Sequence, residues 1–362
     1  MADVTTDAIR NVVLIGSTGA GKTQLAEALL HKAGAINRLG TPDEGNTVSD
    51  FEPEEKERAS SIATAVLHAQ AGGAHINLLD TPGYPDFVGA ALRGVSACDT
   101  AVLVLDAATG VDIHARRLFK AATEAGLARM VVVNKADAEN VELVPLVDQI
   151  REALGPHCRP LTVPVGQGTS LEGVVDAFAG DSGEALMDVA SAHGELVESI
   201  VEADEALMER YLGDETIGEE ELAAAFTQAL VSGTLIPIFF TSARREIGVA
   251  ELLEHLARYA PSPPQGPRRT ARKGAEETAD EVTLAPDPDG PLCAQVFKIV
   301  SDPFVGKISY LRIYRGRLES DTSARINDDR RETKFGQVLR CQGKETEPVA
   351  VEIGRASCRE RV

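Results

Sequence analysis

The feature that most constrains this chain is the segment GSTGAGKT at residues 16–23. It follows an apolar run at residues 11–15 and leads into an amphipathic segment at residues 22–32. The pattern G-x-x-x-x-G-K-[ST] between a strand and a helix places backbone N–H groups and a helix N-terminus around a polyphosphate. It predicts that Lys22 reaches the β- and γ-phosphates and that the Thr23 hydroxyl binds Mg²⁺. The loop residues expected to bind nucleotide are Gly16, Ser17, Thr18, Gly19, Ala20, Gly21, Lys22 and Thr23.

Apolar runs keep alternating with amphipathic segments after this loop. Buried strands are predicted at AHINLLD, AVLVLDA and MVVVN, with helices at residues 114–125 and 141–154. Strands that alternate with helices are typical of a doubly wound, mostly parallel α/β sheet. The predicted fold class is therefore an α/β P-loop domain, which we place at residues 1–260.

Later regions depart from this pattern. Residues 159–233 carry a short strand, a glycine-rich turn and helical stretches at 193–212 and 219–231, and they are predicted to be an inserted subdomain. A buried strand returns at IPIFFTSA, followed by a helix at 249–259. Residues 261–290 hold six prolines beside clustered opposite charges and are predicted to be a linker. A solvated hinge is favoured there over an RNA contact of the basic cluster.

Residues 291–352 are rich in β-forming residues with Gly and Asp turns, which predicts a small antiparallel β-barrel. The last ten residues, IGRASCRERV at 353–362, break the alternation of this barrel and resemble the translation of a common sequencing adapter. We expect them to be such an artefact, with an ordinary basic tail as the alternative. The natural sequence is then expected to end near Glu352 and the chain to be a fragment of a longer protein.

Composition restricts the partners and the compartment. A formal net charge of -20 argues against charge-driven binding to DNA or RNA over the whole surface, although a local contact stays open. No apolar run approaches the roughly 18 residues that span a bilayer, and the N-terminus is too polar for a secretory signal. Five cysteines without a C-x-x-C motif fit neither a disulfide framework nor a zinc site. We expect a cytoplasmic, monomeric protein with no DNA or membrane partner.

Two residues at the end of the strand AHINLLD and just after it, an aspartate and a glycine, are candidates for the phosphate and metal site. Asp80 in DTPGY ends that strand, where its carboxylate can hold Mg²⁺ through water, and the Gly83 N–H can meet the γ-phosphate. Taken singly, D-x-x-G is equally a turn after a strand.

Base selection is predicted from two further strand ends. Asn134, Lys135 and Asp137 form NKAD, in which the Asp137 carboxylate can accept both N–H donors of a guanine edge, which adenine does not offer. Ser242 and Ala243 in TSA can present backbone to the guanine O6. All of these motifs fall at C-terminal ends of predicted strands, where α/β sheets bind ligands. Together they predict GTP as the nucleotide, with Mg²⁺ as cofactor.

With these motifs in this order, the chain resembles the translational GTPases of the elongation factor G class, most closely the elongation factor G-like branch. The resemblance covers about residues 9–352 and rests on DFEPEEKERASSI, EADEALMERYLGDE, GVAELLEHLARYAPSP and VFKIVSDPFVGK. It implies a G domain with an inserted subdomain, a β-barrel second domain, and three further domains that are absent here. It also implies the ribosome as partner, with GTP hydrolysis driving translocation or ribosome recycling.

Three departures from the family concern hydrolysis. Tyr84 stands where the family has the histidine that helps to position the attacking water, and a phenol has no proton switch near neutral pH. Ser61 stands for the Mg²⁺-binding threonine of the family's ERGITI, and Gly19 stands for an aspartate of the phosphate loop. Tyr84 is accordingly a candidate catalytic residue, with simple packing as the alternative, and the efficiency of turnover stays open.

The leading hypothesis is a GTPase that works on the ribosome. The alternative is a ribosome-associated module that binds GTP or GDP with little or no hydrolysis, motivated by Tyr84, Ser61 and Gly19. A ribosome-protection factor is a weaker third option. NKAD disfavours a P-loop enzyme that acts on adenine nucleotides.

Overall fold

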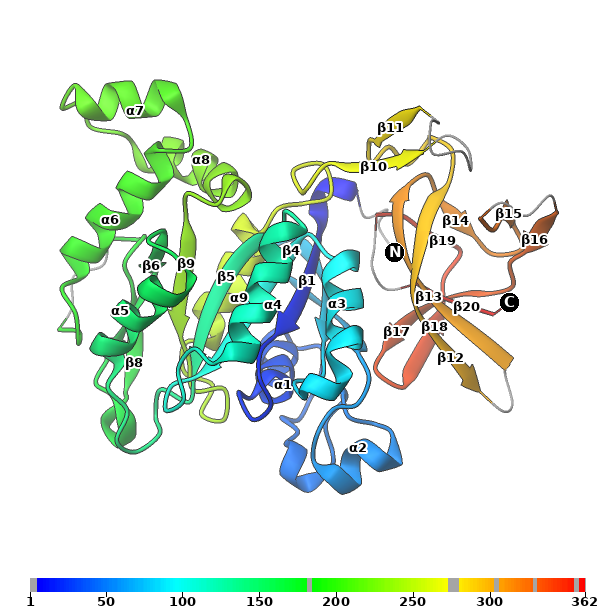
Figure 1. The fold of residues 1–362 in the computed structure, drawn as a ribbon, viewed down its shortest axis with the longest axis horizontal. Helices are drawn as coiled ribbons and strands as arrows, with labels where there is room; N and C mark the ends of the chain where they lie inside the picture. Colours follow the sequence, from blue (N-terminus) through cyan, green and yellow to red (C-terminus); the bar gives the residue numbers. More distant parts are fainter. Residues whose placement is uncertain are drawn as a thin grey trace.

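The computed structural model describes residues 5–180, 184–272, 280–302, 306–327, 331–354 and 358–361. An α/β domain lies beside a smaller domain of antiparallel strands (Figure 1). The α/β domain is built on a seven-stranded sheet with the order β2-β3-β1-β4-β5-β9-β6, in which only β2 runs antiparallel to its neighbour. Its strands are β1 (Ile9–Ile15), β2 (Ala65–Ala71), β3 (Ala74–Asp80), β4 (Thr100–Asp106), β5 (Ala128–Asn134), β6 (Cys158–Pro160) and β9 (Ile236–Phe240). The predicted fold class is confirmed.

Helices cover both faces of this sheet because its strands are apolar on both sides. In β1, Val12 and Leu14 pack with residues of α1 and α9, whereas Val13 and Ile15 pack with residues of α3, α4 and α5. Each such side chain contributes about 1.5–3 kcal/mol when it is fully buried. The helices are α1 (Lys22–Lys32), α3 (Val88–Ala97), α4 (Ile113–Glu124), α5 (Leu143–Leu154) and α9 (Val249–Tyr259).

The region predicted as an inserted subdomain begins within the main sheet, because β6 pairs with β9. A hairpin of β7 (Thr162–Val165) and β8 (Gly173–Asp176) follows, and then three helices (Figure 1). The first and third helices pack into the same core as β4 and β5, whereas the second has no buried residue. The helix expected at 193–212 is two helices. The helical stretch is interrupted at Asp204, whose side chain accepts hydrogen bonds from two backbone N–H groups of the following turn and so starts a new helix. The three helices are α6 (Val189–Val201), α7 (Glu205–Leu212) and α8 (Glu219–Ser232).

Short helical segments lie in the connections. They are η1 (Thr6–Ala8), η2 (Pro42–Glu44), α2 (Pro53–Arg58), η3 (Pro85–Phe87) and η4 (Gly168–Ser170). The segments from η2 to α2 form the long connection between α1 and β2, and η3 lies in the connection between β3 and α3. Both connections border the phosphate loop, as described below.

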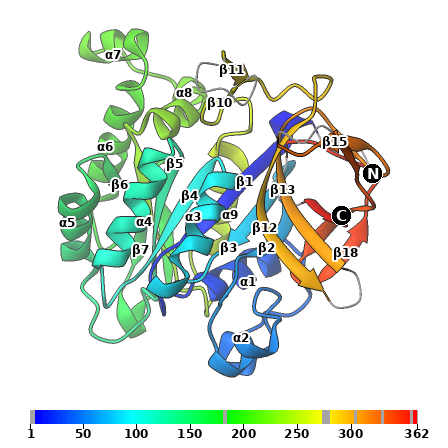
Figure 2. The same cartoon turned by 45° about the vertical axis from the view of Figure 1, so that its right-hand side comes forward.

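The second domain consists of small antiparallel sheets that curve around a modest core (Figure 2). Its largest sheet has the order β12-β13-β20-β17-β18, and its core includes Leu311, Ile313 and Val338. The strands are β12 (Cys293–Asp302), β13 (Gly306–Arg315), β14 (Leu318–Glu319), β15 (Ser323–Arg325), β16 (Glu332–Lys334), β17 (Val338–Gln342), β18 (Glu345–Pro348), β19 (Val351–Glu352) and β20 (Cys358–Arg361).

The segment predicted to be a linker and the tail predicted to be adapter-derived also form strands. Within the predicted linker, β10 (Arg269–Arg272) pairs with β11 (Glu281–Leu284), and residues 273–279 lie outside the described residues. Within the predicted adapter-derived tail, β20 pairs with both β13 and β17. Neighbouring strand edges offer unpaired backbone groups to any extended segment, so this pairing says nothing of where the tail comes from, and its origin stays a prediction.

A buried polar network joins the two domains. Arg312 of β13 forms an ion pair with Asp99 at 2.9 Å, and both side chains are 3% exposed. The Arg312 guanidinium also donates to the Ala97 carbonyl at 2.8 Å, and the amide of Asn11 donates to Asp99 at 2.8 Å. Because Asn11 belongs to β1, the network links the second domain to the strand that leads into the phosphate loop.

Two simpler findings complete the fold. Cys98, Cys158, Cys293 and Cys341 are free thiols. Among the described residues, no helix is both long enough and apolar enough to cross a membrane.

Candidate nucleotide-binding site

The phosphate loop joins β1 to α1 and closes around the Lys22 side chain. The Lys22 Nζ donates to the carbonyls of Gly16 at 2.9 Å and Ser17 at 3.0 Å. The loop can close this tightly only with glycine at its ends: a Cβ on Gly16 would lie 2.3 Å from the Val104 carbonyl oxygen, and one on Gly21 would lie 2.3 Å from the Asn134 amide. The structure therefore has a tight loop around Lys22 at the position where the sequence predicts an anion cradle.

The Lys22 ammonium is buried within this cradle. Burial lowers its pKa to about 8, while the nearby carboxylates of Asp80, Asp50 and Asp112 oppose that change. A buried cation in a loop of backbone N–H groups is an arrangement that favours a polyphosphate ligand.

Four side chains from separate segments meet beside the start of α1, and we call Thr23, Asp50, Ser61 and Asp80 the metal corner. The Thr23 hydroxyl donates to the Asp80 carboxylate at 2.8 Å and lies 3.1 Å from the Ser61 hydroxyl. The structure thus brings together the three residues that the sequence predicts as Mg²⁺ ligands. All four side chains are buried.

The carboxylates of the metal corner lack partners for part of their oxygens. One oxygen of Asp80 and one of Asp50 are enclosed without a hydrogen bond to any described residue. Burial raises the pKa of Asp50 to about 7, with the charge of Asp80 adding to the effect. Burial also raises the pKa of Asp80 to about 6, against the lowering influence of Lys22, Thr23 and Ser49. Both groups would be stabilised in their charged form by a cation.

These donors fit Mg²⁺, which prefers oxygen ligands and retains waters and substrate phosphates in its shell. Among the described residues, no group of three or more His, Cys, Asp or Glu side chains could hold a metal ion by itself. Hydroxyls and phosphates would therefore have to complete the shell. Asp50 was missed by the sequence reasoning, although it is the first residue of the segment DFEPEEKERASSI.

The segment that carries Ser61 is held by a buried carboxylate. Glu55 of α2 accepts hydrogen bonds from the N–H groups of Ile62 at 3.0 Å and Ala63 at 3.1 Å. Between Glu55 and these two residues the chain turns through Ala59, which has the left-handed conformation with φ 47°. Glu55 thus fixes the backbone on both sides of the turn that presents Ser61.

The segment after Asp80 lies directly on the phosphate loop. A Cβ on Gly83 would be 2.6 Å from the Thr18 nitrogen and 2.5 Å from the Lys22 Nζ, so only glycine fits this contact. Tyr84 follows it and precedes η3, and its side chain is 45% exposed. The catalytic role of Tyr84 stays a prediction, with packing within this segment as the alternative.

We call the opposite end of the site, formed by Asn134, Lys135, Asp137, Ser242 and Ala243, the base corner. The Asn134 amide nitrogen donates to the Ala20 carbonyl at 3.0 Å, and its oxygen accepts from the Ala243 N–H at 3.0 Å. The Asn134 oxygen also accepts from the Thr241 hydroxyl at 3.2 Å. One side chain therefore ties the phosphate loop to the TSA segment.

The remaining residues of the base corner are arranged around this link. Lys135 has a left-handed backbone with φ 59°, and its Nζ lies 2.8 Å from the carboxylate of Asp106 at the end of β4. Ser242 forms a two-way backbone bridge with Ile247, which closes the TSA loop. Asp137 is partly exposed. Asp106 was missed from the sequence; its position at the end of the predicted strand AVLVLDA is the signal that could have found it.

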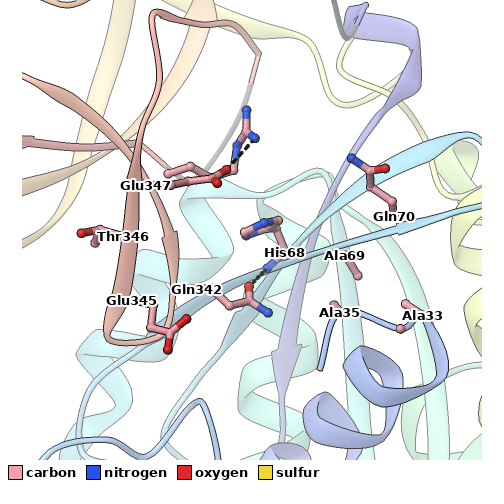
Figure 3. Close-up of a pocket in the computed structure, with 11 residues that line it drawn as sticks. Ala33, Ala35, His68, Ala69, Gln70, Gln342, Glu345, Thr346 and Glu347 are labelled. Atoms are coloured by element: carbon pink, nitrogen blue, oxygen red, sulfur yellow. Dashed lines mark hydrogen bonds and ion pairs between the residues drawn. The ribbon is translucent and has the colours of Figure 1, made fainter. Parts of the chain in front are cut away.

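A separate cavity of about 450 Å³ lies between the end of α1, β2 and the β17–β18 hairpin (Figure 3). Two of its walls engage one another, because the backbone N–H of His68 on β2 donates to the Gln342 side chain on β17 at 2.8 Å. Within the hairpin, Arg340 donates to Glu347 at 3.0 Å. None of the residues predicted to bind nucleotide lines it. It belongs to the junction between the domains.

The chain is similar to known proteins over most of its length. The family model described as "Elongation factor Tu GTP binding domain" matches residues 7–262. An elongation factor G-like protein of Mycobacterium tuberculosis, found in two strains, is 36% identical over 330 residues, or 88% of this chain and 46% of the relative. A crystal structure of a Thermus thermophilus protein aligns with TM-score 0.83 and 34% identity, covering 98% of this chain and 52% of that one. The chain spans about half the length of these relatives.

Proposed function

The chain belongs to the translational GTPases of the elongation factor G type, and on that basis we propose that it binds GTP with Mg²⁺ and hydrolyses it on the ribosome, driving translocation or ribosome recycling. We further propose that residues 1–260 act as the G domain and residues 291–352 as the second domain, and that the protein works in the cytoplasm as a monomer. The observation that carries the proposal is the metal corner. Thr23, Ser61 and Asp80 come from three separate segments and converge within hydrogen-bond distance.

This convergence supports a switch that responds to the γ-phosphate. Thr23 is fixed on α1, whereas Ser61 lies on the long connection before β2 and Gly83 lies on the connection after β3. A bound Mg²⁺ would supply charge neutralisation for the phosphates and a common anchor for the two connections. Loss of the γ-phosphate would release both connections, which is how such GTPases couple hydrolysis to a change of shape.

The base corner supports guanine as the base. Asn134 and Ala243 hold the loops in place, and the partly exposed Asp137 carboxylate would accept the two N–H donors of guanine. Replacing Asp137 by Asn puts an amide donor opposite those N–H groups. We expect Asp137→Asn to weaken GDP binding at least ~100-fold, because a charge-assisted pair of bonds is lost. The variant is expected to favour xanthosine diphosphate. Competition against a fluorescent GDP analogue measures both affinities. Equal GDP affinity of the two proteins would contradict the assignment.

A second candidate function is favoured by Tyr84. Its half-exposed phenol stands at the position from which the family's histidine orders the attacking water, and it offers no imidazole for that task. The chain would then bind GTP or GDP on the ribosome with little turnover.

Single-turnover GTP hydrolysis with and without ribosomes separates the two candidates. The proposed enzyme shows ribosome-stimulated hydrolysis, whereas the binding module shows normal nucleotide affinity without stimulation. Because the chain spans about half of its relatives, the assay is run on this chain and on a full-length relative. A gain in rate on Tyr84→His would assign the difference to this residue, with Tyr211→His on the distant helix α7 as the matched control.

A further inference from the structure

A carboxylate from outside the nucleotide-binding motifs reaches the phosphate loop. The Ser17 hydroxyl donates to the Asp112 carboxylate at 2.7 Å. Asp112 is the N-cap residue of α4, and the same oxygen accepts the Ala115 N–H at 2.7 Å. A single oxygen atom therefore ties the loop to the first turn of a long helix.

Ser17 is also the residue on which the loop's internal bonds converge. Its carbonyl accepts from the Lys22 Nζ at 3.0 Å and from the Ala20 N–H at 3.3 Å. Gly19, in the same loop, has no side chain and nothing within 4 Å of a Cβ that would be added there. Fixing Ser17 therefore fixes one of the two carbonyl acceptors that hold Lys22, the other being that of Gly16.

The bond between Ser17 and Asp112 is in its strong form at neutral pH. Burial alone would raise the pKa of Asp112, but the hydrogen bonds from Ala115 and Ser17 outweigh burial and lower it, so the group is ionised. A hydroxyl that donates to an ionised carboxylate makes a shorter and stronger bond than a neutral pair.

The histidine next to this pair does not compete for the carboxylate at neutral pH. The Nε2 of His114 is enclosed and has no hydrogen-bond partner among the described residues. Burial lowers the pKa of His114, and the charges of Lys22 and Arg117 lower it further, against the opposing effect of Asp112. Because a neutral imidazole forms no ion pair with the Asp112 carboxylate, the negative charge of Asp112 interacts with the Ser17 hydroxyl and the nearby Lys22.

We propose that Asp112 is a positioning residue for the nucleotide: through Ser17 it holds the phosphate loop and the Lys22 ammonium in the arrangement that receives polyphosphate, and it thereby slows nucleotide dissociation. The inference rests on the proposed GTP site and adds a residue outside its motifs. It also identifies α4 as the element that supplies an acidic side chain to a loop whose own position 19 is glycine.

The test is a double-mutant cycle on the full chain, with dissociation of a fluorescent GDP analogue followed by stopped flow. Ser17→Ala removes the hydroxyl, and Asp112→Ser removes the carboxylate but keeps a side chain that can cap α4. Each single variant is expected to speed dissociation about tenfold, the effect of losing one charge-assisted bond. The double variant is expected to match the singles, because both remove the same interaction.

Two further variants separate positioning from general destabilisation. Ser17→Thr restores a hydroxyl and is expected to recover most of the slow dissociation. Asp188→Ser removes an equivalent N-cap carboxylate from α6, where Asp188 accepts the Ala190 N–H at 3.1 Å. It is expected to lower the melting temperature as much as Asp112→Ser does while leaving dissociation unchanged.

Three outcomes would overturn the inference: wild-type dissociation in Ser17→Ala, multiplicative effects in the double variant, or dissociation in Ser17→Thr as fast as in Ser17→Ala. These results differ from failure of the proposed function. If the unmodified chain bound no guanine nucleotide, the proposed function would fall and this inference with it. If the unmodified chain bound nucleotide tightly and the variants behaved like it, only the inference would fall.

Discussion

The two ends of the candidate site differ in how their polar groups are satisfied. At the base corner, both amide atoms of Asn134 are bonded to protein groups, and the TSA loop is closed by its own backbone bridge. At the metal corner, Asp50 and Asp80 each keep an enclosed oxygen without a partner among the described residues. Buried carboxylates without partners destabilise a fold, whereas satisfied networks fix it. The base corner is therefore complete in the protein alone, and the metal corner is complete only with a ligand.

The pH dependence of stability gives the largest expected effect in this comparison. The pKa of Asp50 is raised to about 7 and that of Asp80 to about 6, so the folded chain binds more protons at these groups than the unfolded chain does above about pH 4. Without Mg²⁺, their contribution to stability must then fall as pH rises from about 4 to about 7, by on the order of 3 kcal/mol for Asp80 alone. Urea unfolding in EDTA across this range measures the loss.

Asp50→Asn supplies the control for that measurement, because an amide does not titrate. The variant is expected to lose much of the decline with pH and to gain less from added Mg²⁺ and GDP. An identical pH profile in the variant and the unmodified chain would contradict the picture of an incomplete metal corner.

Replacing Asn134, the side chain that links the two loops of the base corner, gives the next largest expected effect on stability. Asn134→Ala leaves the Ala20 carbonyl and the Ala243 N–H without their partner, and one buried group left unsatisfied costs about 1–3 kcal/mol. We expect this variant to be less stable than the unmodified chain even without nucleotide. A metal-corner variant such as Ser61→Ala is expected to lose much less stability. Exposed Asn37→Ala serves as the neutral control in thermal unfolding. Equal losses at the two corners would break the comparison.

The smallest effect concerns strain next to the metal corner. Ala59 adopts φ 47° where the family motif ERGITI has glycine. A left-handed alanine costs about 1–2 kcal/mol, and the greater freedom of glycine in the unfolded chain offsets part of that cost. Ala59→Gly is therefore expected to stabilise the chain by about 0.5 kcal/mol, visible in urea unfolding. A loss of stability would show that the turn at Ala59 is not strained.

The parts of the candidate site that depend on local pattern are the ones that the sequence predicts without help from the fold. Lys22 and Thr23 follow from the loop motif, and the alternation of apolar strands with helices predicted the sheet that the structure confirms. The expectation that Ser61 shares a site with Thr23 came from the family resemblance, because the two residues belong to segments separated by a long connection.

The site residues that the sequence did not predict are brought to the site by the path of the chain in three dimensions. Asp50, Glu55 and Asp112 are ordinary acidic residues in an acidic sequence, and nothing in their spacing indicates that they lie at the candidate site. Asp204 is similar: it lies inside a helical pattern, and only its capping bonds show that one helix ends and another begins there. Local periodicity does not encode such choices, because tertiary packing decides them.

The buried pair of Arg312 and Asp99 has a consequence for how the molecule comes apart. If the second domain unfolded while the sheet domain kept its fold, Asp99 would lose its counter-charge, and a charge that stays enclosed without its partner costs about 3–5 kcal/mol. That cost is a large share of the stability of a whole domain. The two domains should consequently melt together in a single calorimetric transition, and a mechanical load applied to the smaller one would be carried through Asn11 into the first strand of the larger.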